Sequence, residues 1–178
     1  MEAEDPPIPV DFFISRKFAG LSRGELGLAN SSGNIVYKVK AHPELRTIKL
    51  VLDVAGRPVC SILQCQGGFW QVFWLHGDDE KDLICDVKIT RSSFTRRELE
   101  VVMNPGNSDL LPLKIKGFPF QKSCTIYGSD SVIAQTSFMY KLKQIYVRRN
   151  KYRLTIFPGF SDHVLLIALV VIFFYGKK

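Results

Sequence analysis

The sequence has no hydrophobic run long enough to cross a bilayer, and its first residues lack the basic start and the apolar run that are typical of a secretory signal. Its longest apolar run, residues 164–175, contains twelve residues. As a helix this run is about 18 Å long, against about 30 Å for the bilayer core. The first ten residues are acidic and proline-rich, so they predict a flexible tail over residues 1–10 and not a signal peptide. We therefore expect a chain in the cytoplasm, at the membrane periphery or in the nucleus, and not a secreted one.

Metal ligands and catalytic motifs are also scarce. The four cysteines lie at positions 60, 65, 85 and 124 without the paired spacing of a zinc site, which predicts reduced and mostly buried thiols. The three histidines are far apart, and no Ser–His–Asp order, glycine-rich phosphate loop or zinc motif is present. We expect no catalytic residues, no metal and no cofactor, and therefore no enzyme. A lipid-modifying enzyme is the alternative, but the sequence offers no residue for it.

An acidic loop and an aromatic segment each have a functional and a structural interpretation. The loop 77–82 is rich in Asp and Glu, but it lacks the glycine at position six and the final glutamate of a calcium-binding hand. This favours a solvated turn over a Ca²⁺ site. Residues 69–75 contain two Phe and two Trp, which we expect to pack on a helix and on the outer surface rather than to hold a ligand.

What the sequence does contain is a long series of short strands. Apolar and polar side chains alternate in Leu113–Lys116 and Tyr37–Lys40, which predicts strands with one face toward water and one face toward the core. About twelve strands joined by short connections predict a closed or sandwiched antiparallel sheet. The predicted strands are residues 12–17, 26–30, 35–41, 48–53, 58–63, 69–75, 83–89, 97–103, 111–118, 122–128, 131–138 and 151–158.

The apolar run 164–175 has no polar face, so as a helix it must be buried on all sides. Ser161 can cap its N-terminus, Asp162 suits the positive end, and Gly176 can take a left-handed position before two terminal lysines. A twelve-stranded barrel is too wide for its own side chains to fill, and its expected height of about 18 Å matches this helix. We predict a mainly β fold, a closed antiparallel barrel of about twelve strands enclosing a hydrophobic C-terminal helix. The alternative is a tail that anchors the protein in lipid.

Several short motifs, taken in order, carry a family resemblance. They are Asp53–Val59, Phe69–Phe73, Val87–Ser93, Ile115–Gly117, Cys124–Tyr127, Val132–Gln135, Tyr152–Gly159 and Asp162–Ile172. In their order and spacing the chain resembles the plant LURP-one-related proteins of the tubby C-terminal-like superfamily, which also includes phospholipid scramblases. The resemblance implies a single domain over residues 11–178, a twelve-stranded antiparallel barrel threaded by a hydrophobic C-terminal helix. It also implies a non-enzymatic role associated with plant basal defence, with the phosphoinositide-binding tubby proteins as relatives.

The formal net charge of +7 favours an anionic partner. The densest basic cluster provides the candidate lipid- or anion-binding residues, Lys141, Lys143, Arg148, Arg149, Lys151 and Arg153. Smaller basic groups are Lys114, Lys116 and Lys122, and Arg91, Arg96 and Arg97. The alternative is that residues 148–151 form a solvated hairpin turn whose charges protect strand edges. The family pattern continues into an acidic segment where this chain ends Gly-Lys-Lys, which predicts a basic barrel mouth at the helix end.

These observations favour a regulatory or signalling monomer that docks on an anionic phospholipid, a phosphoinositide in particular, or on a protein partner. Nucleic acid is a weaker candidate, because Tyr146 and Tyr152 beside the cluster are expected to pack a strand rather than to stack on bases. Two alternatives stay open. One is a membrane-tethered transcription regulator that binds nucleic acid, and the other is a C-terminally membrane-anchored protein.

Overall fold

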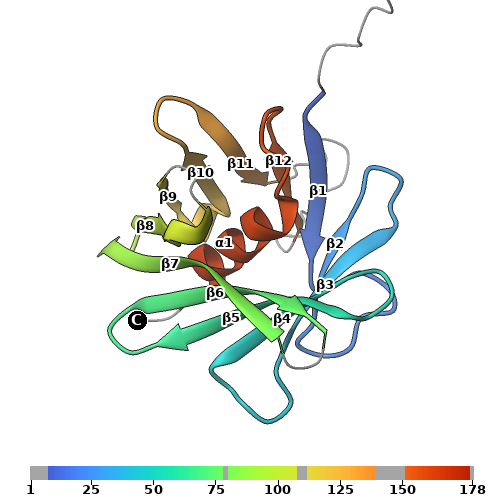
Figure 1. Cartoon of the computed structure of the whole chain (residues 1–178). Helices are drawn as coiled ribbons and strands as arrows, with labels where there is room; N and C mark the ends of the chain where they lie inside the picture. The colour runs from blue at the N-terminus through green and yellow to red at the C-terminus, as the bar shows by residue number, and fades with distance from the viewer. Residues whose placement is uncertain (1–7, 78–79, 108–111, 139–150, 177–178) are drawn as a thin grey trace, which may run out of the picture.

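The computed structural model describes residues 8–77, 80–107, 112–138 and 151–176, and these form a closed barrel around one helix. Figure 1 shows the strands arranged around the helix α1. The strands are β1 (Val10–Ser15), β2 (Leu26–Ala29), β3 (Ile35–Ala41), β4 (Ile48–Leu52), β5 (Pro58–Cys65), β6 (Phe69–His76), β7 (Glu80–Ser92), β8 (Arg97–Met103), β9 (Leu113–Phe118), β10 (Ser123–Tyr127), β11 (Val132–Phe138) and β12 (Lys151–Ile156). The helix α1 is His163–Tyr175, and the short 3-10 helices are η1 (Pro105–Asn107) and η2 (Pro119–Gln121).

Every strand pairs antiparallel with its neighbours in the sequence, and β12 pairs with β1 to close the barrel. The register places Val10 opposite Ile156 and Ser15 opposite Lys151, so the first and last strands align along their full length. Closure leaves no unpaired edge in the sheet that the described strands form. The predicted closed antiparallel barrel of about twelve strands is therefore confirmed.

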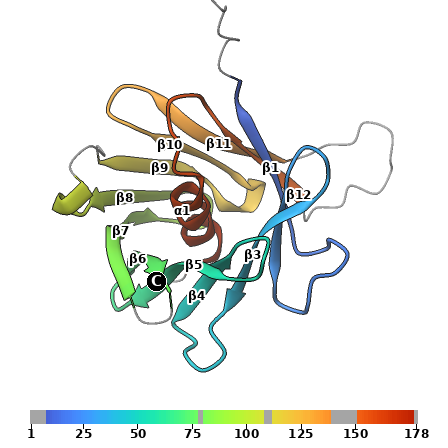
Figure 2. The ribbon, with the colours of Figure 1, turned by 45° about the vertical axis from the view of Figure 1, so that its right-hand side comes forward.

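The helix α1 fills the barrel and forms the centre of the hydrophobic core. Residues 165–173 are all buried, so no face of the helix meets water. Alternate residues of the strands point inward against it, for example Ile115 on β9 and Leu154 on β12, both with no exposed surface. Figure 2 shows the strands surrounding α1. The apolar run is therefore a plug inside the barrel, as predicted from its length and its lack of a polar face.

The two ends of α1 are held differently. Asp162 is the N-cap, because its carboxylate accepts a hydrogen bond of 3.1 Å from the backbone N–H of Leu165. At the other end Gly176 has φ −70° and not the left-handed conformation that we predicted. A side chain at this position would contact the Ile172 carbonyl and lie 3.0 Å from the Trp70 ring. Glycine is therefore needed here for close packing and not for a positive φ.

The motif Asp53-Val-Ala-Gly-Arg57 forms the turn between β4 and β5. The Asp53 carboxylate accepts hydrogen bonds from the backbone N–H groups of Ala55 and Arg57, at 3.0 and 2.9 Å. The bond from the Arg57 N–H is the main cause that lowers the pKa of the Asp53 carboxyl. Gly56 takes φ +79°, which side chains rarely adopt. This motif therefore has a structural role as an Asx turn.

Candidate anion-binding mouth of the barrel

The loops of an antiparallel barrel alternate between its two ends, and this sorts the charges of the chain. The end where α1 finishes, which we call the C-terminal mouth, is formed by the described loops 16–25, 42–47, 66–68, 93–96 and 119–122. The opposite mouth is formed by the described residues 30–34, 53–57, 77, 104–107, 112, 128–131 and 157–162.

The described loops of the two mouths carry opposite charge. Those of the C-terminal mouth contain the basic residues Arg16, Lys17, Arg23, Arg46, Arg96 and Lys122 and the acidic residues Glu25 and Glu44. Those of the opposite mouth contain the basic residue Arg57 and the acidic residues Asp53, Asp130 and Asp162. The net positive charge of the loops is therefore concentrated where the helix ends.

Tyr175, the last residue of α1, is the centre of the C-terminal mouth. Three cations lie over its ring: Arg16 Cζ at 4.8 Å, Lys49 Nζ at 5.5 Å and Lys122 Nζ at 4.8 Å from the ring centroid. They come from the end of β1, from β4 and from the β9–β10 loop. The ring face attracts each cation, but the cations repel one another. Among the described residues, no carboxylate forms an ion pair with Arg16 or Lys122.

Lys122 is fixed in place by its backbone. It adopts the left-handed conformation, φ 48°, as the last residue of the β9–β10 turn, and its N–H donates to the Pro119 carbonyl at 3.2 Å. Its own carbonyl accepts a 2.9 Å hydrogen bond from the buried Thr136 hydroxyl. Burial lowers the pKa of the Lys122 ammonium, and the nearby Arg16 lowers it further. The site thus holds a cation where its charge is poorly solvated.

A surface cavity of about 370 Å³ opens beside Tyr175 on the side of Arg16 and Lys122. Its lining includes Arg16, Lys17, Arg23 and Lys122, and none of the described residues that line it is acidic. The volume lies within the range of small-molecule sites. A ring of guanidinium and ammonium groups around such a cavity is suited to a phosphate or another compact anion.

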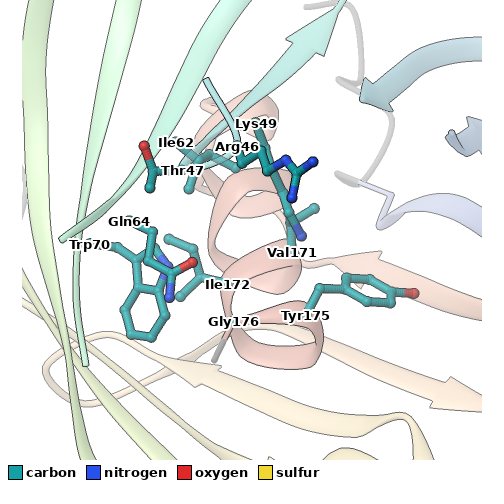
Figure 3. A pocket seen from close by; sticks show the side chains of 10 residues that line it. All are labelled: Arg46, Thr47, Lys49, Ile62, Gln64, Trp70, Val171, Ile172, Tyr175 and Gly176. Carbon is teal, nitrogen blue, oxygen red and sulfur yellow. The ribbon is translucent and has the colours of Figure 1, made fainter. Parts of the chain in front are cut away.

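A second cavity is also lined by Tyr175 and lies between the helix and β4, β5 and β6. Figure 3 shows Arg46 and Lys49 beside the last turns of the helix, with Trp70 and Gln64 farther round it. This cavity has a volume of about 30 Å³, which is enough for about one water molecule. The larger anion site is therefore on the Arg16 side of Tyr175.

Arg97 is also at this mouth, and one nitrogen of its guanidinium is occupied by the helix. Its Nη1 donates to the carbonyls of Phe173 at 2.6 Å and of Gly176 at 3.1 Å. These carbonyls belong to the negative end of the helix dipole, which a cation stabilises. Burial lowers the pKa of Arg97. The predicted terminal cations, Lys177 and Lys178, lie outside the described residues.

The basic cluster predicted from the sequence is only partly within the described residues. Lys141, Lys143, Arg148 and Arg149 lie outside the described residues. Lys151 and Arg153 are on β12, where alternation places them on the outer wall, since Tyr152 between them is buried. The Lys151 ammonium lies 5.6 Å from each of the Phe13 and Phe18 rings, and Arg153 is exposed. Neither residue lines the cavity at Tyr175.

Most of the residues that form the site were not predicted from the sequence to be site residues. Arg16 and Lys49 are isolated in the sequence from any dense basic run, and Tyr175 was taken only as the end of the plug. Lys122 was noted as one member of a smaller basic group. The sequence also predicted a basic mouth at the helix end from Lys177 and Lys178, and both lysines lie outside the described residues. The described loops of this mouth are mainly basic through other residues.

The described part of the chain gives little support to a catalytic or metal site. Burial raises the pKa of the Cys85 and Cys124 thiols to about 12, and the cysteines at 60, 65, 85 and 124 are free. A thiol with so high a pKa is a poor nucleophile. Among the residues that the structure covers, no group of three or more His, Cys, Asp or Glu side chains is arranged to hold a metal ion. Of the paired aromatics of β6, Trp70 is buried in the core and Trp74 packs against it.

No helix within the described ranges combines the length and the apolar character needed to cross a membrane.

Known proteins resemble this chain over most of its length. A family model described as LURP-one-related matches residues 10–174. The Arabidopsis thaliana protein LURP-one-related 7 is 48% identical over 169 residues, covering 95% of this chain and 91% of that protein. LURP-one-related 15 from the same plant is 27% identical over 173 residues, covering 93% and 79%. An X-ray structure of an Arabidopsis thaliana protein matches with a TM-score of 0.67 and 28% identity, covering 93% of this chain and 90% of that one. None of these names denotes an enzyme.

Proposed function

The chain belongs to the LURP-one-related family, and we propose that it is a non-enzymatic regulatory module that binds an anionic phospholipid headgroup at its C-terminal mouth. One observation carries the proposal. The cationic groups of Arg16 and Lys122 each lie 4.8 Å from the centre of the same Tyr175 ring, beside a cavity whose described lining holds no carboxylate.

A bound anion would compensate the charges of this mouth. Two cations held close together in a poorly solvated position raise the free energy of the unliganded protein. A phosphate between them removes this repulsion and accepts charge-assisted hydrogen bonds from both. Because an adjacent anion favours the ammonium form, the bound phosphate also shifts the Lys122 pKa back upward. Burial and Arg16 had lowered that pKa.

The ligand class follows from size and charge together. A phosphoinositide headgroup presents several phosphates on one ring, and the basic loops around the cavity provide further cations in Lys17 and Arg23. A single inorganic phosphate would use only part of this surface. Lys151 and Arg153 add a positive field near the same end of the barrel. They belong to the dense basic cluster predicted from the sequence and lie on the outer wall.

The biological setting is part of the proposal. The family resemblance supports a role in plant basal defence, and the chain would act at the cytoplasmic face of a membrane. Docking on a protein partner is the alternative use of the same surface. The absence of an activated nucleophile among the buried thiols of the described residues supports binding rather than catalysis.

Vesicle flotation tests this proposal. Purified protein would be mixed with phosphatidylcholine vesicles, with or without a few per cent of a bisphosphorylated phosphoinositide, at low and at physiological salt. We expect phosphoinositide-dependent flotation that weakens as salt increases. The double variant Arg16→Gln/Lys122→Asn should bind at least about tenfold more weakly, since each charged hydrogen bond contributes about 1.5–3 kcal/mol. Asparagine is chosen at position 122 because it tolerates the left-handed backbone.

The matched control removes the same charge at the opposite mouth. Arg57 lies in the β4–β5 turn and Lys114 at the start of β9, and both are exposed. The variant Arg57→Gln/Lys114→Gln should float like the wild type. Failure of the wild-type protein to float at low salt, or equal losses in the two double variants, would contradict the proposal.

A further inference from the structure

Two phenylalanines project together from the C-terminal mouth. Phe94 is 82% exposed and Phe120 is 68% exposed, and their ring centroids are 5.0 Å apart with the planes tilted by 40°. Phe94 belongs to the β7–β8 turn and Phe120 to η2, so two separate loops contribute to the pair. Phenylalanine side chains are usually buried in the protein interior. An exposed aromatic pair built from two loops therefore requires a functional explanation.

Both loops are held in a defined shape by internal hydrogen bonds. In the β7–β8 turn the Ser93 N–H donates to the Arg96 carbonyl at 2.8 Å, and the Arg96 N–H donates to the Ser93 hydroxyl at 3.1 Å. The η2 turn closes with the Lys122 N–H on the Pro119 carbonyl at 3.2 Å. The same turn thus directs Phe120 into solvent and places Lys122 on Tyr175.

Each loop combines one phenylalanine with one cation. The β7–β8 loop is Ser-Phe-Thr-Arg at residues 93–96, and the β9–β10 loop is Pro-Phe-Gln-Lys at residues 119–122. Neither loop contains an acidic residue. An apolar tip bordered by cations is the chemistry that peripheral proteins use at anionic bilayers, where the rings enter the interface and the cations remain among the headgroups.

We propose that the Phe94–Phe120 pair is a membrane-insertion tip, which enters the interfacial layer of an anionic bilayer while Arg16 and Lys122 hold a headgroup phosphate. This inference rests on the proposed function and adds the orientation of the protein. The C-terminal mouth faces the bilayer, and the acidic opposite mouth faces away from it. Because η2 carries Phe120 and is followed directly by Lys122, insertion and headgroup binding reinforce each other.

The size of the apolar tip favours a bilayer over a protein partner. A stable protein interface buries about 800 Å² on each partner, with a core of several packed residues. Two neighbouring rings provide only a fraction of that area. A bilayer accepts such a small insertion, because the lipids rearrange around it and the surrounding cations contribute the remaining attraction.

The test compares vesicle partition with headgroup binding in solution. The variant Phe94→Ser/Phe120→Ser should lose at least about tenfold in partition to phosphoinositide vesicles, as expected from the apolar area of two rings. Its affinity for soluble inositol trisphosphate, measured by calorimetry, should equal that of the wild type. The matched control is Val54→Ser/Val132→Ser, which removes two exposed apolar side chains, 82% and 40% exposed, at the opposite mouth. This control should partition like the wild type.

A second measurement detects insertion directly. In Phe120→Trp, brominated lipids should quench the fluorescence of the added tryptophan, whereas the wild-type emission from the buried Trp70 and half-buried Trp74 should change little. Equal partition of the wild type and the Phe94/Phe120 variant, with no quenching of the added tryptophan, would overturn the insertion tip and leave the proposed function standing. If the wild-type protein binds neither vesicles nor the soluble headgroup, the insertion tip and the proposed function are both overturned. Binding of single-stranded RNA without binding of vesicles would also overturn the insertion tip.

Discussion

At the scale of single residues, Arg97 joins the wall of the barrel to the end of its plug. The guanidinium comes from the first residue of β8 and donates to two carbonyls at the end of α1, those of Phe173 and Gly176. Its removal takes a charged donor away from the carbonyls of the buried Phe173 and the partly buried Gly176. This loss is costly, because hydrogen bonds to charged partners contribute about 1.5–3 kcal/mol.

We predict that Arg97→Met lowers the free energy of unfolding by about 1.5–3 kcal/mol, measured by urea denaturation. Arg96→Met is the matched control, because Arg96 forms a partly exposed ion pair with Glu98 at 3.7 Å. An exposed pair of this kind contributes about 0–1 kcal/mol. Equal effects of the two substitutions would contradict the role of Arg97 at the helix end.

Asp162 gives a prediction that depends on pH. Burial raises the pKa of its carboxyl above the usual 3.8, although the Leu165 N–H and His163 act in the opposite direction. The folded chain therefore binds the Asp162 proton more tightly than the unfolded chain. Protonated Asp162 therefore contributes to stability. This contribution is fully present below the pKa that Asp162 has in the unfolded chain, and it is lost as the pH rises through the raised pKa of the folded chain.

Two substitutions separate the charge of Asp162 from its capping oxygen. Asp162→Asn keeps an acceptor and should be more stable than the wild type at pH 7, with the difference vanishing near pH 3, below the unfolded pKa of about 3.9. Asp162→Ala removes the cap and should cost about 1 kcal/mol. Thermal melts at both pH values measure these effects. A less stable Asp162→Asn protein at pH 7 would mean that the helix dipole outweighs burial at this position.

At the scale of elements, the helix α1 and the strands require each other. The helix has no polar face and cannot stand in water, and the barrel without it encloses an unfilled space. Leu169 lies in the middle of the helix and has no exposed surface. The packing of this residue therefore reports on the plug itself.

We predict that Leu169→Ala costs about 2–5 kcal/mol of folding stability, the range for cavity-forming core substitutions. Val102→Ala on the outer wall, where Val102 is 61% exposed, should cost much less. Chemical denaturation of both variants checks the difference.

Truncation after Pro158 should leave an insoluble chain, and a soluble truncated protein with cooperative unfolding would disprove the plug.

The elements were largely predictable because their signals are local. Strands β3 and β8 begin and end at the predicted residues, since alternation is clear and turn residues border them. The strand β7 is longer than predicted, Glu80–Ser92 against 83–89. At its start, residues 80–82 pair with residues 74–76 of β6, so the predicted turn over 77–82 was wrong for these three residues. At its end, Arg91 and Ser92 pair with Glu98 and Arg97 on β8. Pairing of this kind depends on the partner strand and has no signature in the segment itself.

The candidate site was much less predictable than the fold. Arg16, Lys122 and Tyr175 are far apart in the sequence and meet only because the barrel closes and the plug ends among them. The prediction of a left-handed Gly176 was also wrong, because the role of this glycine depends on the Trp70 ring, which is far away in the sequence. Dense runs of charge attract attention in a sequence, whereas a site built from single residues on separate strands does not.

At the scale of the whole molecule, the two ends of the barrel have different chemistry. The described loops of the C-terminal mouth are mainly basic and carry the exposed Phe94–Phe120 pair, and those of the opposite mouth are mainly acidic. A chain with this polarity should approach an anionic surface with one end only. The plug contributes to this polarity, because its last residue organises the cations of the mouth.

Hydrogen exchange measured by mass spectrometry, with and without phosphoinositide vesicles, tests this polarity most directly. We predict slower exchange on binding in residues 16–25, 93–96 and 119–122, and unchanged exchange in residues 53–57 and 128–131 of the opposite mouth. Slower exchange at the opposite mouth, or unchanged exchange everywhere while the protein is bound to vesicles, would show that the C-terminal mouth does not face the bilayer.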